Sequence, residues 1–322
     1  MNFIFDTLEE NPSQKILVFT TKNTSLYTTP NFLNTKIYRF GTISSNPTKR
    51  YASYVWFNLM SSIVLLWYRV DKIIVFETLS IFPLWLVSKL VKSKKGHIHF
   101  HEYISEIERI ESSTYMKSLF KFEDQLLKKY PCSHTNEDRK QLFLIDKPFL
   151  QSEMIEVRPN IPPKSWWNKY GQFKEKSFNE STRLVYIGAF DDQTMYVKEL
   201  LDWVLANQDK LELTIISHQL NKQTEDLIAC YKTKAIRVMK PIDYYDLPKE
   251  LIKYDIGLVL YKGHIPNYVY NIPNKVYEYL SCGLEVMVDI KLLSTANLTL
   301  SKIKVVDFED LKGTCNFLKP IE

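Results

Sequence analysis

The segment 271–283 combines residue types that could bind a phosphorylated sugar. Pro273 suits the first turn of a helix, where its missing N–H costs nothing, and Gly283 suits the helix end. Lys275 and Glu278 are three residues apart, so they share one face of such a helix. Because the start of a helix presents free N–H groups and partial positive charge, it is suited to a phosphate. We therefore expect an anion near Lys275, with Glu278 one turn further along to accept hydrogen bonds from sugar hydroxyls.

The same spacing also describes an ordinary amphipathic helix. Val276, Tyr279 and Leu280 fall at positions that form an apolar face, which leaves Lys275 and Glu278 on the opposite, solvated side. Spacing alone favours this second interpretation, since helices of this kind are common on protein surfaces. The two interpretations differ in whether the lysine and the glutamate have a ligand to bind.

Histidines alternate along a predicted strand in the first half of the chain. His97, His99 and His101 therefore point to one face of that strand. This spacing is compatible with zinc, but no further His or Cys has a supporting spacing, and we expect no metal. His101 and Glu102 end the strand and form either a functional or a structural pair. Glu77 follows the preceding strand, where it either faces the same site or caps the next helix.

Short apolar strands alternate with helices in both halves of the chain, which predicts parallel sheets covered by helices on both faces. In the first half the predicted strands are 16–20, 36–40, 71–76 and 97–101, and the predicted helices are 51–67, 82–91 and 105–129. In the second half the strands are 183–188, 211–217, 236–239, 255–261 and 286–288, and the helices are 197–207, 223–231, 244–253 and 273–282. A proline-rich break followed by a polar stretch predicts two domains, 1–160 and 183–322, joined by a linker at 161–182.

The composition of the 322-residue chain disfavours several classes of protein. Its net charge of +5 is too weak a basic character to indicate nucleic acid. Eight glycines leave little material for a glycine-rich phosphate loop, and the absence of GxGxxG after a first strand argues against an NAD-dependent enzyme. The four cysteines are far apart, the N-terminus does not resemble a signal peptide, and the apolar runs are too short to span a membrane. These features predict a cytoplasmic location.

The first half also combines apolar and basic segments. The helix predicted at 51–67 is strongly apolar, and four lysines lie at the end of the next predicted helix and just after it: Lys89, Lys92, Lys94 and Lys95. This combination is consistent with a peripheral position on the anionic inner face of a membrane, where a lipid-linked molecule could be reached. The alternative is a core helix followed by a solvated loop.

The run 273–283, PNKVYEYLSCG, resembles the donor-binding signature of the GT-B glycosyltransferases, particularly the retaining family 4 type. The segments 246–259 and 183–188 resemble that family's elements before the signature and at the start of its C-terminal domain, and 158–162 resembles its linker entry. The resemblance implies two Rossmann-like domains whose parallel sheets face a cleft, with a nucleotide-sugar donor on the second domain. It also implies that Glu278 holds the nucleotide ribose and that Lys275 lies near the phosphates.

The function implied by the resemblance is transfer of a sugar from a nucleotide-sugar donor to a hydroxyl of a glycan or lipid-linked glycan, with retention of configuration. The donor-binding candidates are Gly188, Lys240, Asn274, Lys275 and Glu278. His101 and Glu102 resemble the pair that lines the acceptor side of the cleft. The chain has no Asp-x-Asp motif, which disfavours a metal-dependent transferase of the GT-A type, and the donor is a co-substrate, so no cofactor is expected. The Lys-, Asn- and Ile-rich composition associates the product with a bacterial surface polysaccharide.

Some features of the family are missing, and they favour a different class of function. Tyr270 occupies the position where the family often has a first glutamate, and Ala189 follows Gly188 where a basic residue is usual. The alternative is therefore a non-catalytic GT-B-like protein that binds a glycan or accompanies an active transferase. Binding of a nucleoside diphosphate would separate the two alternatives.

Overall fold

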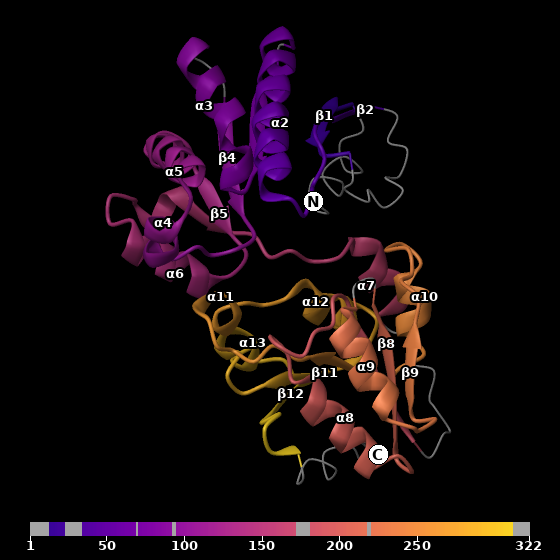
Figure 1. The fold of residues 1–322 in the computed structure, drawn as a ribbon. Helices are drawn as coiled ribbons and strands as arrows, with labels where there is room; N and C mark the ends of the chain where they lie inside the picture. The colour runs from indigo at the N-terminus through magenta and orange to yellow at the C-terminus, as the bar shows by residue number, and fades with distance from the viewer. Residues whose placement is uncertain are drawn as a thin grey trace. The chain divides into compact units, whose positions relative to one another are not determined.

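The computed structural model of the chain describes residues 13–22, 34–68, 70–91, 95–171, 181–217 and 220–311. The chain divides into two compact units, with the boundary between Asn160 and Ile161. Figure 1 shows both units and labels most of their helices and strands. In the described residues the strands of every sheet pair in parallel, as the alternation of strands and helices predicts.

The first unit contains two parallel sheets. The larger one has four strands in the order β3 (Lys72–Phe76), β4 (Lys95–Phe100), β5 (Cys132–His134) and β6 (Ile155–Val157). In the smaller sheet, β1 (Ile16–Thr20) pairs with β2 (Thr35–Arg39). The strands β1 to β4 lie where the sequence predicts them. The strands β5 and β6 are not predicted from the sequence, because strands of three residues are too short to show an alternating pattern.

The helices described in the first unit are α2 (Pro47–Trp67), α3 (Ile81–Leu90), α4 (Glu106–Glu111), α5 (Thr114–Leu127) and α6 (Glu137–Asp146). The prediction of one continuous helix over 105–129 is wrong, because α4 and α5 are separate. Ser112 between them has an extended backbone, and the Ser113 hydroxyl accepts a hydrogen bond from the Met116 N–H (3.3 Å), which caps α5. The hydrogen bonds of serine to nearby backbone groups favour such a break over continuation of the helix.

A buried ionic network joins three elements of the first unit. Glu123 of α5 is only 1% exposed and accepts hydrogen bonds from the Thr78 hydroxyl and from the Arg109 guanidinium of α4 (2.6 Å). Arg109 also donates to Asp124 (2.9 Å). A buried carboxylate is costly unless it is paired and hydrogen-bonded. The network therefore holds α4, α5 and the 3-10 turn η1 (Thr78–Ser80) in one arrangement.

The second unit contains one six-stranded parallel sheet in the order β12-β11-β10-β7-β8-β9. Its strands are β7 (Thr182–Ile187), β8 (Leu211–Ile216), β9 (Ile236–Met239), β10 (Ile256–Val259), β11 (Glu285–Asp289) and β12 (Ile303–Val306). The first five lie where the sequence predicts strands. The chain order reverses at the pair β7–β10, which makes this pair the topological switch point of a doubly wound sheet.

Helices cover both faces of the six-stranded sheet. One face carries α8 (Val197–Ala206) and α9 (Lys222–Cys230), and the other carries α7 (Lys164–Tyr170), α10 (Leu247–Leu251) and α12 (Asn274–Ser281). Two shorter helices lie in the connections: α11 (Pro266–Val269) precedes α12, and α13 (Leu293–Ala296) precedes β12. Each face has its own apolar cluster, so the sheet is the middle layer of three.

Part of the range in which the sequence predicts a linker is a helix of the second unit. The side chain of Trp166 in α7 is buried in the apolar cluster that also contains Val185 and Leu251. Its ring centroid lies 4.8 Å from that of Tyr244. A single large aromatic side chain buries enough area to anchor an otherwise polar helix of this length. The residues 172–180 lie outside the described part of the chain.

We predict that Glu123→Gln destabilises the protein much more than loss of an exposed ion pair would. The change leaves the buried cations of Arg109 and Lys147 with the more exposed carboxylate of Asp124, besides the surface contact of Arg109 with Glu106. Breaking a buried pair costs about 3–5 kcal/mol. Glu106→Gln is the matched control, because Glu106 contacts the same guanidinium (3.4 Å) from an exposed position and should contribute at most about 1 kcal/mol. Free energies of unfolding in urea measure both. Equal losses in the two variants would contradict the role of the network.

Candidate functional site

The carboxyl ends of β7 and β10 form the switch point of the second unit. In open α/β sheets, ligands bind in the crevice that such a reversal creates outside the strand ends. Gly188 directly follows β7, and α12 begins at Asn274 on the connection that follows β10. The start of α12 and the end of β7 therefore lie at the edge of the sheet where a ligand is expected.

Gly188 lies beside Lys275 of α12 and has a backbone conformation that favours glycine. Its φ of 111° is a conformation that residues with a side chain rarely adopt, and a Cβ at this position would lie 3.6 Å from Lys275 Nζ. The Gly188 N–H donates to the carbonyl of Ile216 (3.0 Å), which extends the ladder between β7 and β8 by one residue. The structure thus brings together two of the predicted donor-binding residues, Gly188 and Lys275.

Tyr279 fixes the position of α12 on the sheet. Its ring lies against Gly257 of β10, where a Cβ would come within 2.2 Å of the ring. Its hydroxyl accepts a hydrogen bond from the Ile187 N–H of β7 (3.1 Å) and donates to the carbonyl of Leu258 in β10 (3.4 Å). From the sequence, Tyr279 is predicted only as part of an apolar face, and its role on the sheet is not foreseen. A glycine inside a predicted strand, which often marks a close approach, was the available signal.

Lys275 is buried among aromatic rings at the start of α12. The residue is 9% exposed, and its ammonium donates a hydrogen bond to the Tyr186 hydroxyl (2.8 Å). The same ammonium lies 4.0 Å from the Tyr186 ring centroid and 5.1 Å from that of Tyr261. Burial lowers the pKa of Lys275 to about 7. The interpretation of Lys275 and Glu278 as a solvated pair is therefore wrong, because packing of α12 on the strand ends covers both side chains.

Glu278 is a buried carboxylate without a partner in the described structure. The residue is 9% exposed, and no described side chain or backbone N–H donates to its carboxylate. Burial raises the pKa of Glu278 to about 7, and the positive charge of Lys275 opposes this shift. An unpaired buried carboxylate is costly, so hydroxyl donors from a ligand would lower its free energy. Titratable groups with such shifted pKa values gather at functional sites more often than elsewhere.

The other two donor-binding candidates, Asn274 and Lys240, have no described contact with the groups around Lys275. Asn274 is the first residue of α12 and its side chain is exposed. Lys240 follows β9, two strands away from β7, and its side chain is also exposed. In the part of the chain that the structure describes, no contact joins Lys240 to Lys275. Lys262, after β10, instead donates to the carbonyl of Asp192 (2.9 Å) and holds the loop that follows β7.

In the first unit, the carboxylate beside His101 belongs to Glu77 and not to Glu102. His101 Nδ1 lies 3.7 Å from Glu77 Oε1, and the same carboxylate accepts hydrogen bonds from the backbone N–H groups of His101 and Glu102 (3.3 Å for the latter). The Glu102 side chain is exposed. The sequence analysis placed Glu77 near this site as one of two alternatives, and the parallel pairing of β3 with β4 explains why the two strand ends meet.

Both His101 and Glu77 have pKa values shifted toward the neutral form. Burial lowers the pKa of His101 to about 4 and raises the pKa of Glu77 to about 7. His101 is therefore neutral at neutral pH, and its buried Nε2 has no hydrogen-bond partner among the described residues. Glu77 has a φ of 62°, which is rare for a residue with a long side chain. Strained backbone of this kind persists where surrounding bonds enforce it, often at functional sites.

The other two histidines of β4 have structural partners. His97 Nε2 and His99 Nδ1 both lie within hydrogen-bond distance of the buried Ser133 hydroxyl, at 2.8 and 2.7 Å. Ser133 belongs to β5, so the three side chains tie the two strands together. Within the described ranges, no group of three His, Cys, Asp or Glu residues is arranged to hold a metal ion.

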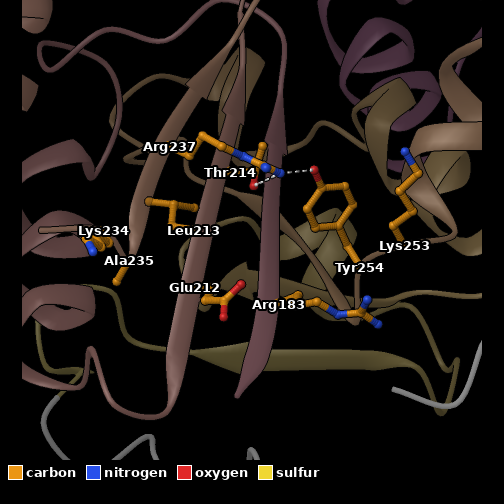
Figure 2. Close-up of a pocket in the computed structure, with 9 residues that line it drawn as sticks. All are labelled: Arg183, Glu212, Leu213, Thr214, Lys234, Ala235, Arg237, Lys253 and Tyr254. Atoms are coloured by element: carbon orange, nitrogen blue, oxygen red, sulfur yellow. Dashed lines mark hydrogen bonds between the residues drawn. The ribbon is translucent and has the colours of Figure 1, made fainter. Parts of the chain in front are cut away.

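A cavity of about 180 Å³ lies at the opposite edge of the six-stranded sheet from Gly188 and α12. Figure 2 shows its lining, which comes from the amino-terminal parts of β7, β8 and β9 and from the residues before β10. Arg237 donates there to the hydroxyls of Thr214 and Tyr254, at 3.3 Å each. Arg183 is paired with Asp255 (3.3 Å). This cavity is separate from the switch point, and no residue predicted from the sequence to bind the donor lines it.

A scan against protein-family models finds no match, and a search of curated proteins finds no similar sequence. Among solved structures, sucrose-phosphate synthase from Thermosynechococcus elongatus is similar, with a TM-score of 0.63, 14% identity, and coverage of 94% of this chain and 77% of that one. An alpha,alpha-trehalose-phosphate synthase (UDP-forming) from Burkholderia vietnamiensis has a TM-score of 0.58 at 11% identity, with 83% and 67% covered.

A third similar structure is the lipopolysaccharide outer core galactosyltransferase WaaB. It has a TM-score of 0.53 and 12% identity, with coverage of 89% of this chain and 76% of that one. Similarity at such low identity concerns the arrangement of helices and strands. Together with the two parallel α/β units and the switch point at β7 and β10, it shows that this chain has the fold of the GT-B glycosyltransferases.

Proposed function

We propose that the protein is a glycosyltransferase that moves a sugar from a nucleotide-sugar donor to a hydroxyl of a glycan or lipid-linked glycan. The observation that carries this proposal is the burial of both Lys275, in the first turn of α12, and Glu278, one turn later, beside the switch point. An ammonium for a diphosphate and a carboxylate for hydroxyl groups are the two recognition elements that a nucleotide sugar requires. Their order along the helix puts the phosphate at the positive end of the dipole.

The chemical step follows from these placements. The bond between the sugar anomeric carbon and the donor phosphate breaks, and a bond to the acceptor oxygen forms. The nucleoside diphosphate leaves with the bonding electrons, and Lys275 and the N–H groups of α12 stabilise its developing charge. The acceptor proton passes to a phosphate oxygen of the donor. This division of roles requires no metal and no cofactor. In the first unit, neutral His101, positioned by Glu77, is the candidate to contact the acceptor hydroxyl, and Glu102 contributes its backbone N–H to that arrangement.

Two structures with the same fold support the choice of donor class and stereochemistry. One is described as trehalose-6-phosphate from E. coli bound with UDP-2-fluoro glucose, and it covers 83% of this chain at 13% identity. Another concerns glycosyltransfer with retention by trehalose-6-phosphate synthase. These descriptions apply to those proteins. For this chain we infer a nucleotide-sugar donor and retention of configuration as part of the proposal.

For the acceptor we propose a glycan of a bacterial surface polysaccharide, assembled on a lipid at the inner face of the membrane. The name of the similar lipopolysaccharide galactosyltransferase supports this class of acceptor. Of the lysines expected to contact an anionic surface, Lys95 begins β4 with an exposed side chain, whereas Lys92 and Lys94 lie outside the described residues. None of the described helices is long and apolar enough to cross a membrane.

The second candidate function is that of a non-catalytic protein with the same fold. It is favoured by Ala189 after β7, where no basic side chain supplements Lys275, and by Tyr270 in the position of a first glutamate. A thermal-shift screen with UDP, GDP and ADP separates the two functions, because a ligand that binds only the folded state raises the melting temperature. A protein that binds none of the three would belong to the second class.

We predict that Glu278→Gln weakens binding of the nucleoside diphosphate by about tenfold or more. Charge-assisted hydrogen bonds contribute about 1.5–3 kcal/mol each, and about 1.4 kcal/mol corresponds to tenfold in affinity. The melting temperature should not fall, because the substitution removes a carboxylate that is buried without a partner. Glu225→Gln on the exposed part of α9 is the control and should leave affinity unchanged. Calorimetric titration measures the affinities, and wild-type affinity in Glu278→Gln would show that α12 does not bind the ribose.

We predict that binding of the diphosphate weakens as the pH rises above about 7. The pKa of Lys275 is about 7 in the free protein, and the diphosphate binds its protonated form. Affinity should therefore fall by up to about tenfold per pH unit above that value, until the pKa of the bound state is reached. Binding of the nucleoside alone should not fall, since it has no phosphate, and Lys275→Met should remove the fall in diphosphate binding above about pH 7. Titrations between about pH 7 and about pH 9 test this, and parallel curves for nucleoside and diphosphate would contradict it.

A further inference from the structure

The helix α2 has its polar side chains inside and its apolar side chains outside. Its buried residues are Ser53, Asn58, Ser61, Ser62 and Leu65. Its large exposed apolar residues are Val55, Trp56, Leu59, Ile63, Leu66 and Trp67. A surface helix of a soluble domain normally has the reverse arrangement. Of its apolar residues, Leu65 alone belongs to the described apolar cluster around β3 and β4, so most of the large apolar side chains of α2 lie outside that core. The alternative of a core helix concerns the segment 82–91, and there α3 does bury Leu84 and Val87.

The polar inner face is firmly attached to the rest of the first unit. The Asn58 side-chain amide donates to the carbonyl of Leu79 (3.0 Å) and to the Tyr115 hydroxyl (3.3 Å). The Ser53 hydroxyl accepts a hydrogen bond from the Thr42 N–H. These bonds determine which face of α2 is inside, so the outward direction of the apolar side chains is imposed by the fold.

The outward side chains form one continuous stripe along the helix. Their positions follow the spacing i, i+4, i+8 and i+11 from Val55 to Leu66, which keeps them on one face. Trp56 is 52% exposed and Trp67 is 86% exposed. Leu90, at the end of the neighbouring helix α3, is 61% exposed and adds to the apolar surface at that end. Apolar patches of this kind mark surfaces that contact a partner or a membrane.

The charges of α2 itself are positive, and further lysines outnumber the exposed Asp71 near its C-terminal end. Between Pro47 and Trp67 the helix contains no Asp or Glu, and Lys49 and Arg50 lie in its first turn. At the other end, the exposed Lys36 donates to the Tyr68 hydroxyl (2.9 Å), and the exposed Lys89 lies near the end of α3. An apolar face flanked by basic residues complements an anionic lipid surface.

We propose that the outer face of α2 is a membrane-docking surface that lies in the plane of an anionic leaflet. This inference deepens the proposed function, because it explains how a soluble domain would reach a lipid-linked acceptor. Tryptophans at both ends of the stripe suit the boundary between lipid head groups and acyl chains. Small and polar residues toward the protein and large apolar residues outward are the arrangement of helices surrounded by lipid.

The same charges argue against a second copy of the chain as the occupant. In a symmetric dimer through α2, Lys49 and Arg50 of each copy would approach a helix that has no carboxylate to pair with them. Burying these cations without partners would cost free energy. An anionic lipid surface supplies negative charge along the whole length of the stripe.

Vesicle co-sedimentation of the full chain, without nucleotide or acceptor, tests the proposal. We expect the wild type to bind vesicles that contain phosphatidylglycerol and to bind pure phosphatidylcholine more weakly, with the difference reduced by salt. The double variant Trp56→Glu/Ile63→Glu should bind at least about tenfold less, which corresponds to about 1.4 kcal/mol. The matched control is Ile107→Glu/Ile110→Glu, which adds the same charge at exposed isoleucines of α4 and should bind like the wild type.

A second measurement does not depend on the folding of the charged variants. Brominated phosphatidylglycerol should quench part of the wild-type tryptophan fluorescence, and Trp56→Phe/Trp67→Phe should remove the quenched part. The proposal would be overturned if the wild type does not bind vesicles, or if Trp56→Glu/Ile63→Glu and Ile107→Glu/Ile110→Glu bind them equally. It would also be overturned if the quenching is unchanged in Trp56→Phe/Trp67→Phe. A dimer that Trp56→Glu/Ile63→Glu converts to a monomer, without vesicle binding, would overturn it in favour of a second copy. Because no donor is present, none of these outcomes bears on the donor site at Glu278.

Discussion

The seating of Tyr279 on Gly257 is the contact on which the candidate site of the second unit depends. The ring occupies the space of a missing side chain, and its hydroxyl bridges the backbone of β7 and β10 at the point where the strand order reverses. Because a helix is rigid over two turns, fixing Tyr279 also fixes Lys275 one turn earlier. The ammonium of Lys275 is thereby placed near the rings of Tyr186 and Tyr261, next to Gly188. Packing at one glycine thus determines where charge is buried at the switch point.

Both units place titratable groups at the carboxyl ends of parallel strands and shift their pKa values by burial. In the second unit this affects Lys275 and Glu278, and in the first unit His101 and Glu77. Burial of this kind lowers stability, and it is tolerated here because the surrounding backbone is fixed by sheet pairing and by hydrogen bonds. Violations of local folding rules are expected where a site has a task other than stability. The positive φ of Glu77 and the unpartnered carboxylate of Glu278 are two such violations.

In the first unit, the whole helix α2 also departs from the usual folding rules, because its polar face is inside and its apolar face is outside. Apart from Leu65, the core of this unit does not use the large apolar side chains of the helix, because the apolar cluster around β3 and β4 is built mainly from the strands and from α3 and α5. The Asn58 amide and the Ser53 hydroxyl of α2 supply specific polar contacts instead. The helix is therefore held in place by its polar face, and its apolar face is available for contact with a different environment.

The sequence by itself determined the fold class, most strand positions and the helix that carries the site, because these depend on local patterns. Alternating apolar strands and helices require a parallel sheet, and Lys275 and Glu278 are recognisable from their spacing on a helix. Only the tertiary structure decided which groups meet. Glu77 and His101 follow different strands, and the pairing of β3 with β4 brings them together. The partner of His101 is therefore Glu77, and not its neighbour in the sequence, Glu102. Burial of Lys275 and exposure of Trp67 likewise depend on which face of a helix the rest of the chain covers. Residue spacing shows which side chains share a face, but it does not show which face is turned toward the protein.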